Sequence, residues 1–299
     1  MTQNITCINC KHPAQLFFNA KDFNRRISEE VFPYYRCQNC ELIFLNPVPK
    51  NLGDYYREDY YDLPNSIEEH DKKAKNLQQW KIDLVNRFSK KGKLLEIGPA
   101  YGLFSHLAKQ SGFDVTAIEM DARCCDYLRD VVGINVVNNI DTSAAISTLS
   151  KFDVIVFWQV LEHLADPMTV LDLAAEHLSP GGVLIFDTPN PNAFQFRVLG
   201  KYWTHIDAPR HVTLIPIELV SERLKTAGLQ PELITSSDKS ANGFNGFGWA
   251  FSFKNFFSNE ILGSIVHLFG RVLAKLLIPI ERTGWRGSTY TVVFRRPKI

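Results

Sequence analysis

From residue 93 onward, short apolar runs of strand length alternate with longer segments of helical periodicity. The strand-like runs fall at residues 94–97, 114–118, 135–137, 154–158 and 183–187, and two more follow at 229–236 and 288–296. Helical periodicity begins after Gly102, Asp121, Asp166 and Pro216. Strands that alternate with helices in this way pair in parallel, and the helices cover both faces of the sheet. The pattern therefore predicts an α/β fold.

The first 90 residues follow a different pattern. Residues 1–45 are rich in loops and show little helical periodicity, and the sequence NPVP at 46–49 interrupts the chain. Within residues 67–90, apolar side chains recur at helical spacing, which indicates an amphipathic helix; they are Leu77, Trp80, Leu84 and Phe88. We expect three segments: a small module at 1–48, a linker with a lead-in helix at 49–90, and the α/β domain at 91–299.

Composition and charge narrow the class of protein. The 299 residues include 33 basic and 32 acidic side chains, and 45% are hydrophobic. These proportions are ordinary for a soluble globular protein and exclude collagen-like, disordered and disulfide-dense secreted chains. A net charge of +1 gives no overall attraction to nucleic acid. Neither a basic patch nor an apolar run follows Met1, so we expect no secretory signal and a cytoplasmic protein with reduced cysteines.

Four of the six cysteines form two C-x-x-C pairs, Cys7 with Cys10 and Cys37 with Cys40. Two such pairs can close a tetrahedral thiolate site, and a module of about 45 residues builds little core without such help. Four thiolates in a reducing compartment favour zinc. A closed four-thiolate site serves folding rather than catalysis, so we predict a structural zinc ion. A rubredoxin-like iron site, a redox dithiol and a chance arrangement are the alternatives.

The most informative motif is LLEIGPAYGLFSHLAK at residues 94–109. A buried strand ends near Glu96, and a turn of small residues, with Gly98, Ala100 and Gly102, opens a helix. Such a turn lets a ligand lie against backbone N–H groups at the start of the helix. The spacing differs from the G-x-G-x-x-G of dinucleotide-binding proteins. A carboxylate at the strand end instead suits a ligand with a cationic amino acid part.

A second carboxylate, Glu119, ends the next strand in VTAIEMD, where it can accept both hydroxyls of a ribose. With these motifs, FDVIVFWQVLEHLADP at 152–167 and LSPGGVLIFDTPNP at 178–191 resemble the strand motifs of class I S-adenosylmethionine-dependent methyltransferases. The resemblance runs from about residue 70 to the end and implies a Rossmann-like sheet of seven strands. Ala100 stands where that family most often has glycine. We expect it to be tolerated because the position needs a small side chain more than a positive φ.

The resemblance implies which residues bind S-adenosylmethionine. It assigns the methionine part to Glu96 and Gly98, which lie in the same turn as Ala100 and Gly102. It assigns the ribose to Glu119 and the adenine to the turn from Asn139 to Asp141. Trp158 and Gln159 would line the floor of the site beside the sulfonium. One alternative is a glycine turn that only packs tightly in another Rossmann-like fold. The other is a degenerate relative that no longer transfers methyl groups.

Methyl transfer to an alcohol requires that the alcohol lose its proton, and the pKa of histidine suits this step. His163 follows the fourth predicted strand and His211 lies after the fifth, both at the edge where open α/β sheets bind ligands. We predict that His211 and His163 are catalytic and that His205, Asp207 and Arg210, in the same loop, contact the substrate. Alternatively, both histidines only hydrogen-bond the backbone, and Asp207 and Arg210 only pair with each other.

A four-cysteine ribbon ahead of such a domain resembles bacterial enzymes that methylate sugars and cell-surface polysaccharides. The resemblance implies O-methylation of a sugar in a surface glycan or in its nucleotide- or lipid-linked precursor. A quinone- or lipid-precursor O-methyltransferase is one alternative, and an inactive methyltransferase-fold scaffold is the non-enzymatic one. RNA methylation is disfavoured, because residues 1–45 hold five basic against four acidic side chains, too weak a charge for a phosphate binder.

A strongly hydrophobic insert, at about residues 239–286, precedes the last predicted strand. Seven aromatic residues lie within 244–257, and residues 261–280 are long enough to span a bilayer. Arg271 and Lys275 make spanning expensive. With His267 they fall on one face of a helix, while large apolar residues lie elsewhere around it. We therefore predict peripheral membrane contact through residues 244–280, at the inner face of the membrane. An internal lid or an oligomer interface is the alternative.

Overall fold

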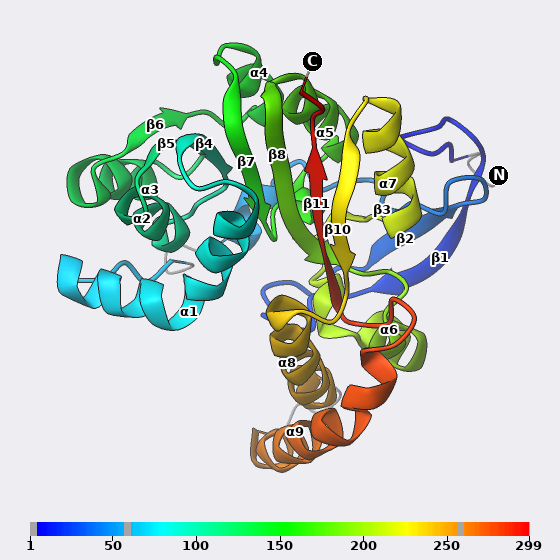
Figure 1. Cartoon of the computed structure of the whole chain (residues 1–299). Coiled ribbons are helices and arrows are strands. Elements are labelled where there is room, and N and C mark those ends of the chain that lie inside the picture. The colour runs from blue at the N-terminus through cyan, green and yellow to red at the C-terminus, as the bar shows by residue number, and fades with distance from the viewer. Residues whose placement is uncertain (1–4, 57–60, 256–259, 299) are drawn as a thin grey trace.

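The larger of two sheets forms the centre of the protein (Figure 1). The computed structural model describes residues 5–56, 61–255 and 260–298. Within them, seven strands pair in the order β10–β11–β8–β7–β4–β5–β6. All neighbours are parallel except β11, which is antiparallel to β10 and β8. The strands are β4 (Gly92–Ile97), β5 (Phe113–Glu119), β6 (Asn135–Asn138), β7 (Phe152–Trp158), β8 (Leu178–Pro189), β10 (Gln230–Thr235) and β11 (Thr289–Arg295). The predicted Rossmann-like fold is confirmed.

Helices cover both faces of this sheet, because successive residues of a strand point to opposite sides. On β4, Leu94 packs with α1 and α2, whereas Leu95 packs with α4, α5 and α7. The helices are α1 (Ile67–Phe88), α2 (Leu103–Gln110), α3 (Ala122–Tyr127), α4 (Thr142–Ser147), α5 (Pro167–Glu176), α6 (Phe194–Leu199) and α7 (Ile217–Thr226). In α1 the buried residues include Ile82 and Val85, while Leu77 of the expected apolar stripe faces solvent.

The N-terminal residues form a second, four-stranded sheet in the order β1–β2–β3–β9. Its strands are β1 (Ala14–Ala20), β2 (Phe32–Cys37), β3 (Ile43–Leu45) and β9 (Thr213–Leu214). The last strand comes from the α/β domain and pairs with β3. Phe44 and Leu42 also pack in the same core as the central sheet. The N-terminal module is therefore joined to the domain by both hydrogen bonds and apolar packing.

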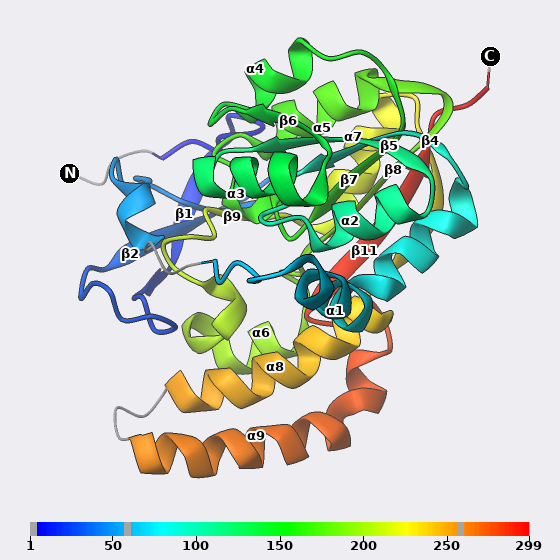
Figure 2. The same cartoon turned by 90° about the vertical axis from the view of Figure 1, so that its left-hand side faces the viewer.

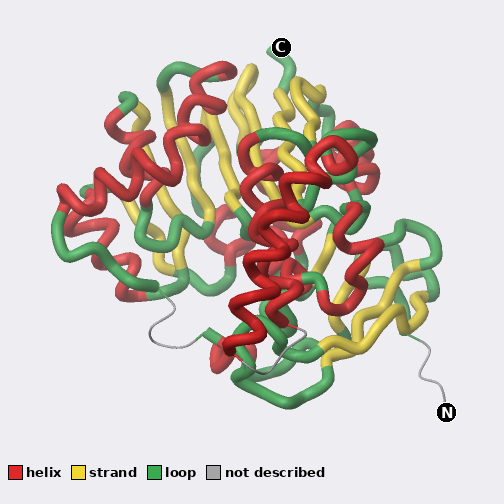
Figure 3. Tube along the Cα trace, turned by 90° about the horizontal axis from the view of Figure 1, so that it is seen from below, coloured by secondary structure: helices red, strands yellow, loops and turns green. Residues whose placement is uncertain are grey.

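The hydrophobic insert is a helical hairpin of α8 (Lys239–Asn255) and α9 (Glu260–Glu281). It extends from the edge where the parallel strands end (Figure 1), and lies along the bottom of the molecule in Figure 2. Seen from below, its two helices lie in front of the sheet (Figure 3). Glu281 anchors α9, because its buried carboxylate accepts hydrogen bonds from Trp249 Nε1 and Gln195 Nε2, both at 2.8 Å. Of the aromatic cluster, Phe256 and Phe257 lie outside the described residues.

Candidate active site and metal site

The small-residue turn connects the end of β4 to the start of α2. Gly98 and Gly102 have φ angles of +67° and +81°. A Cβ atom on Gly98 would lie 2.7 Å from Val160 Cγ2, and one on Gly102 would collide with Leu128. Ala100 has a φ of +53°, so this position requires a positive φ as well as the small side chain expected from the sequence. An alanine in this conformation costs about 1–2 kcal/mol relative to right-handed backbone.

Glu96 is a buried carboxylate at the end of β4. Ser105 Oγ donates a hydrogen bond to it from α2. Burial raises the pKa of Glu96 to about 7, although Ser105 and the nearby Lys81 oppose the shift. A carboxylate in this setting gains stability when a cation binds beside it. The site therefore fits the cationic amino acid part of the predicted cofactor.

Glu119 ends β5 and holds the glycine turn from the neighbouring strand. Its Oε2 atom accepts a hydrogen bond from the Ala100 N–H at 3.0 Å. Its Oε1 atom accepts two more, from the N–H groups of Met120 at 2.8 Å and Asp121 at 2.9 Å. An ionised carboxylate can accept about four hydrogen bonds. Glu119 therefore retains capacity for one hydroxyl of a ribose.

The two residues predicted to contact the adenine, in the turn after β6, make hydrogen bonds within that turn and to the start of α4. Asn139 Oδ1 accepts a hydrogen bond from the Asp141 N–H, and Asp141 Oδ1 caps α4 by accepting from the Ala144 N–H. Two apolar side chains that the sequence reading did not single out lie at this edge, because β5 and β6 are paired here. Met120 is 58% exposed and Ile140 is 81% exposed. Exposed apolar side chains of this size offer a surface on which a planar base can stack.

Trp158 and Gln159, at the end of β7, carry buried donors without partners. Trp158 Nε1 and Gln159 Nε2 are both buried, and neither has a hydrogen-bond partner. The Gln159 N–H donates to Asp187 Oδ1 at 3.0 Å, which fixes the turn against β8. Lys81 Nζ lies 4.8 Å from the centre of the Trp158 ring, and its charge influences both Glu96 and Asp187. Unpaired buried donors are costly, so this position fits a ligand that supplies acceptors.

Glu162, His163 and His211 form a compact group beside this turn. One ligand atom of each lies within 4.8 Å of those of the other two, and the two imidazole rings are 4.6 Å apart. His163 Nδ1 lies 3.0 Å from the Arg210 carbonyl oxygen, and His211 Nδ1 lies 2.8 Å from that of His205. A carbonyl oxygen can only accept, so donation to it places the ring proton on Nδ1 and leaves a lone pair on Nε2. Tyr56 Oη also lies 2.9 Å from His163 Nδ1 and would then accept from the same N–H group. The predicted pair of histidines is thus brought together, with both Nδ1 atoms bonded to backbone.

The protonation states in this group follow from burial. Burial, followed by the nearby His163, lowers the pKa of His211 to about 3, and burial also lowers the pKa of His163. Burial raises the pKa of Glu162 to about 8. Glu162 Oε2 accepts a hydrogen bond from Thr188 Oγ1 at 2.9 Å, whereas its Oε1 has no partner. The sequence analysis missed Glu162, although it directly precedes His163 in the motif.

The loop residues predicted to contact substrate are placed inside the protein instead. Arg210 is fully buried and bonds to Asp207 (Nη2 to Oδ1 at 2.8 Å) and to Asp22 of the N-terminal module (2.7 Å). His205 is also buried, with its Nε2 atom 3.1 Å from the Phe244 carbonyl oxygen. Arg210 and His205 are thus buried and bonded within the protein, while Asp207 pairs with Arg210 and stays partly exposed. Their geometry gives them a structural role, which differs from the contact expected from the sequence.

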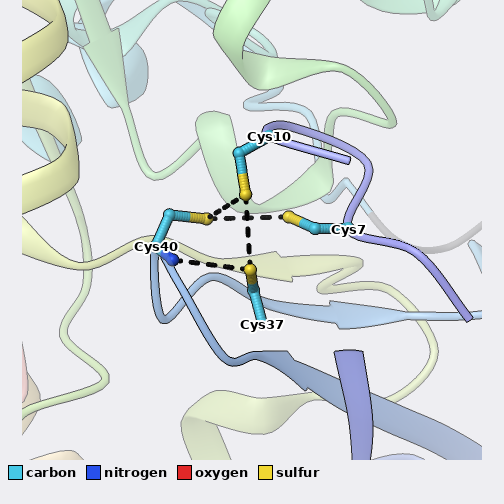
Figure 4. A group of neighbouring side chains, drawn as sticks. All are labelled: Cys7, Cys10, Cys37 and Cys40. Atoms are coloured by element: carbon cyan, nitrogen blue, oxygen red, sulfur yellow. Dashed lines mark hydrogen bonds between the residues drawn. The ribbon is translucent and has the colours of Figure 1, made fainter. Parts of the chain in front are cut away.

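The four predicted metal ligands converge at one point (Figure 4). The Sγ atoms of Cys7 and Cys40 are 3.6 Å apart, those of Cys10 and Cys37 are 3.4 Å apart, and those of Cys10 and Cys40 are 3.6 Å apart. All four cysteines are free of disulfides. Sulfur atoms around a tetrahedral zinc ion at about 2.3 Å would be about 3.8 Å apart. The donor set and its size therefore fit zinc.

Known proteins resemble the α/β domain. A family model described as a methyltransferase domain matches residues 70–234. The ubiquinone biosynthesis O-methyltransferase of Cereibacter sphaeroides (strain ATCC 17023) is 30% identical over 174 residues, which cover 54% of this chain and 67% of that protein. The enzyme of the same name from Pseudomonas fluorescens (strain Pf0-1) is 31% identical over 138 residues, covering 44% and 59%.

Solved structures show the same fold at low sequence identity. A SAM dependent methyltransferase from Archaeoglobus fulgidus superposes with a TM-score of 0.52 at 16% identity, over 75% of this chain and 94% of that one. Haemonchus contortus phosphoethanolamine N-methyltransferase 2, in complex with S-adenosyl-L-methionine, gives a TM-score of 0.53 at 14% identity, over 86% and 62%. This chain therefore belongs to the methyltransferase domain family and has the fold of class I S-adenosylmethionine-dependent methyltransferases.

Proposed function

We propose that this protein transfers a methyl group from S-adenosylmethionine to a hydroxyl oxygen of a quinone-precursor or related lipid-linked acceptor. The main observation that supports the proposal is the match of residues 70–234 to the methyltransferase domain. The buried Trp158 Nε1 and Gln159 Nε2 donors at the end of β7, which have no hydrogen-bond partner, also support it. The curated relatives cited above are named O-methyltransferases of ubiquinone biosynthesis. They favour this acceptor over the sugar implied by the sequence resemblance.

The cofactor would lie along the carboxyl ends of β4, β5 and β7. Glu96 would pair with its amino group, and Glu119 would accept a ribose hydroxyl. Trp158 Nε1 and Gln159 Nε2, which lack partners, would donate to acceptor atoms of the cofactor or the substrate. Met120 and Ile140, being exposed beside Glu119, would face the adenine, a contact proposed here in addition to Asn139 and Asp141.

When bound, S-adenosylmethionine supplies an electrophilic methyl group on its sulfonium, which an acceptor oxygen takes as the carbon–sulfur bond breaks. The residues of this chain position the acceptor and receive its proton. His211 and His163 are neutral at pH 7, because burial lowers the pKa of each, so a lone pair is available. Glu162, when ionised, would stabilise the imidazolium that forms. Positioning in a water-poor site would supply most of the acceleration.

Transfer of labelled methyl groups tests the proposal. The protein would be incubated with S-adenosylmethionine labelled in the methyl group and with phenolic polyprenyl lipids, lipid-linked and nucleotide-linked sugars, or RNA. We expect label in the phenolic lipids and production of S-adenosylhomocysteine. Label confined to sugars would favour the glycan reading, and label confined to RNA would contradict both. Cofactor binding without transfer to any acceptor would support the inactive scaffold.

We also propose that Cys7, Cys10, Cys37 and Cys40 hold one structural zinc ion. The sulfur separations support this site, as does the set of backbone N–H donors around it. The N–H groups of Asn39 and Cys40 lie 3.3 and 3.4 Å from Cys37 Sγ, and such bonds stabilise a thiolate ligand. A closed site of four thiolates has no open position for a substrate. Its contribution would therefore be to the fold of the N-terminal module.

A further inference from the structure

Helix α9 exposes many of its large apolar side chains to solvent. Among its described residues, seven large apolar side chains are exposed: Leu262, Ile265, Leu268, Phe269, Val272, Leu276 and Ile280. Leu268 is 63% exposed and Leu276 is 70% exposed. At 100° per residue, these positions fall within about 120° of the helix circumference. They form one continuous surface, called here the α9 apolar stripe.

The inner face of α9 combines small residues with the partly buried Leu273 and Leu277. Gly263, Gly270 and Ala274 are buried, and a Cβ atom on Gly270 would lie only 2.6 Å from the Trp249 carbonyl oxygen of α8. A surface helix of a soluble protein normally buries its apolar side and exposes its polar side. α9 departs from this rule, because it exposes a wide band of large apolar side chains in addition to the polar Arg271 and Lys275. The side chains of the α9 apolar stripe are exposed and do not pack against the α/β domain. The structure therefore does not use them as the internal lid that the sequence analysis gave as an alternative.

The charged side chains described beside the stripe are basic. Residues 239–286 hold six basic and two acidic residues. Of the two acidic residues, Glu281 is buried against Trp249 and Gln195. Arg271 and Lys275, in contrast, are exposed and border the stripe on one side of the helix. A partner for this surface must therefore be apolar in its interior and negatively charged at its boundary.

We infer that α9 lies in the interface of an anionic membrane, with the apolar stripe at the boundary of headgroups and acyl chains. Anionic lipids provide both the apolar layer and the negative charge that this face requires. A second copy of the chain fits less well, because a two-fold contact would place the same basic face against itself. A spanning orientation would place the charges of Arg271 and Lys275 inside the apolar core of the membrane, which is unfavourable for each.

The hairpin also sets how the catalytic edge would face the membrane. Ser240 Oγ, near the start of α8, donates to Asp187 Oδ2 at 2.5 Å, and Asp187 in turn holds the Gln159 turn. The anchoring contact therefore lies at the end of β8, beside the candidate active site. The inference goes beyond the proposed reaction, since membrane binding requires neither cofactor nor acceptor.

Flotation of the full-length protein with lipid vesicles tests the inference. Vesicles of equal parts phosphatidylglycerol and phosphatidylcholine should carry the protein at low salt, and pure phosphatidylcholine should carry much less. Arg271→Glu with Lys275→Glu should lower the partition coefficient at least tenfold. The matched control is Lys91→Glu with Lys151→Glu, the same change in charge at exposed sites on the opposite edge of the sheet, which should bind like wild type.

A second pair of variants tests the apolar stripe. Leu268→Ser with Leu276→Ser should also lose flotation, whereas Leu77→Ser, at a similarly exposed leucine of α1, should retain it. Circular dichroism would verify that every variant is folded. The inference is overturned if wild type stays unbound at low salt, or if the α9 variants float as well as wild type. It is also overturned if wild type is a dimer that the serine variant converts to a monomer while neither floats.

Discussion

Asp22 and Arg210 form a fully buried ion pair that joins the N-terminal module to the loop that carries His211. Asp22 Oδ1 lies 2.7 Å from Arg210 Nη2, and neither side chain is exposed. The carbonyl oxygen of Arg210 in turn lies 3.0 Å from His163 Nδ1. Tyr34 of the same module donates to the His211 carbonyl oxygen at 2.7 Å. The module thus holds the backbone on which both candidate bases depend.

Breaking this pair should destabilise the protein and disturb the histidines. Asp22→Ala leaves the Arg210 guanidinium buried with fewer partners, and we expect a loss of about 3–5 kcal/mol in the free energy of unfolding. Denaturant titration would measure it. Lys21→Ala is the matched control, because the Lys21–Glu29 pair lies at the surface and such pairs contribute little. Equal stability of Asp22→Ala and the control would show that the pair does not hold the loop.

Metal analysis should find about one equivalent of zinc per chain. Cys37→Ser should lose most of the metal and lower the melting temperature, because binding to a closed thiolate site contributes to folding. Cys124→Ser, at a buried cysteine of α3 outside the cluster, should keep the metal. A metal-free protein that melts cooperatively with an ordered N-terminal sheet would refute the zinc site.

Glu119→Ala should weaken binding of S-adenosylmethionine by about 1–3 kcal/mol, because the variant loses an acceptor for ribose and the hydrogen bond from Ala100 that holds the glycine turn. Isothermal titration calorimetry measures this change. Asp114→Ala, near the other end of the same strand, should bind like wild type. Unchanged affinity in Glu119→Ala would place the ribose elsewhere.

Cofactor affinity should rise with pH below neutrality. Burial raises the pKa of Glu96 to about 7, so the carboxyl is mostly protonated at lower pH, and binding a cation must displace its proton. Affinity should therefore increase nearly tenfold between pH 5 and pH 6 and level off above the pKa. Glu96→Gln, which has no carboxyl proton to lose, should show a flat profile. The same slope in wild type and variant would exclude Glu96 as the titrating group.

Turnover should depend on the ionisation of Glu162. Burial raises the pKa of its carboxyl to about 8, so the ionised form appears as pH rises, and kcat should increase between pH 7 and pH 9. Glu162→Gln should remove this rise and lower kcat by about 10²–10⁴-fold. His211→Ala should lower kcat and leave cofactor affinity nearly intact. His177→Ala is the control, because the His177 ring bonds to the Leu173 carbonyl oxygen at the end of α5, and this variant should change neither kcat nor cofactor affinity. If kcat of the wild type did not change between pH 7 and pH 9, Glu162 would not be the group whose ionisation controls turnover.

The central sheet was predictable because each strand is an apolar run bounded by turn residues, and all seven runs are strands. The N-terminal strands were not, since Leu16 and Phe17 of β1 face solvent and break the alternation that marks a strand. β9 has only two residues, too few to leave any periodic signal.

The candidate site was predictable where chemistry follows a local motif, as at Glu96 and Glu119. It was not predictable where a residue's role depends on distant partners. From the sequence, Arg210 is a plausible substrate ligand. In the structure, Asp22, which is 188 residues away in the chain, pairs with its charge. Lys81 precedes every methyltransferase motif, and only the packing of α1 brings it to Trp158.

The pairing of β3 with β9 sets an order of events during synthesis. Residues 5–45 are synthesised before β9, and the strand that completes their sheet follows about 170 residues later. At about 5–20 residues per second, this interval lasts roughly 10–30 s. During that time the four thiols are present without the core that Phe44 later shares with the central sheet. Zinc captured early would protect these thiols from oxidation while the rest of the chain is made.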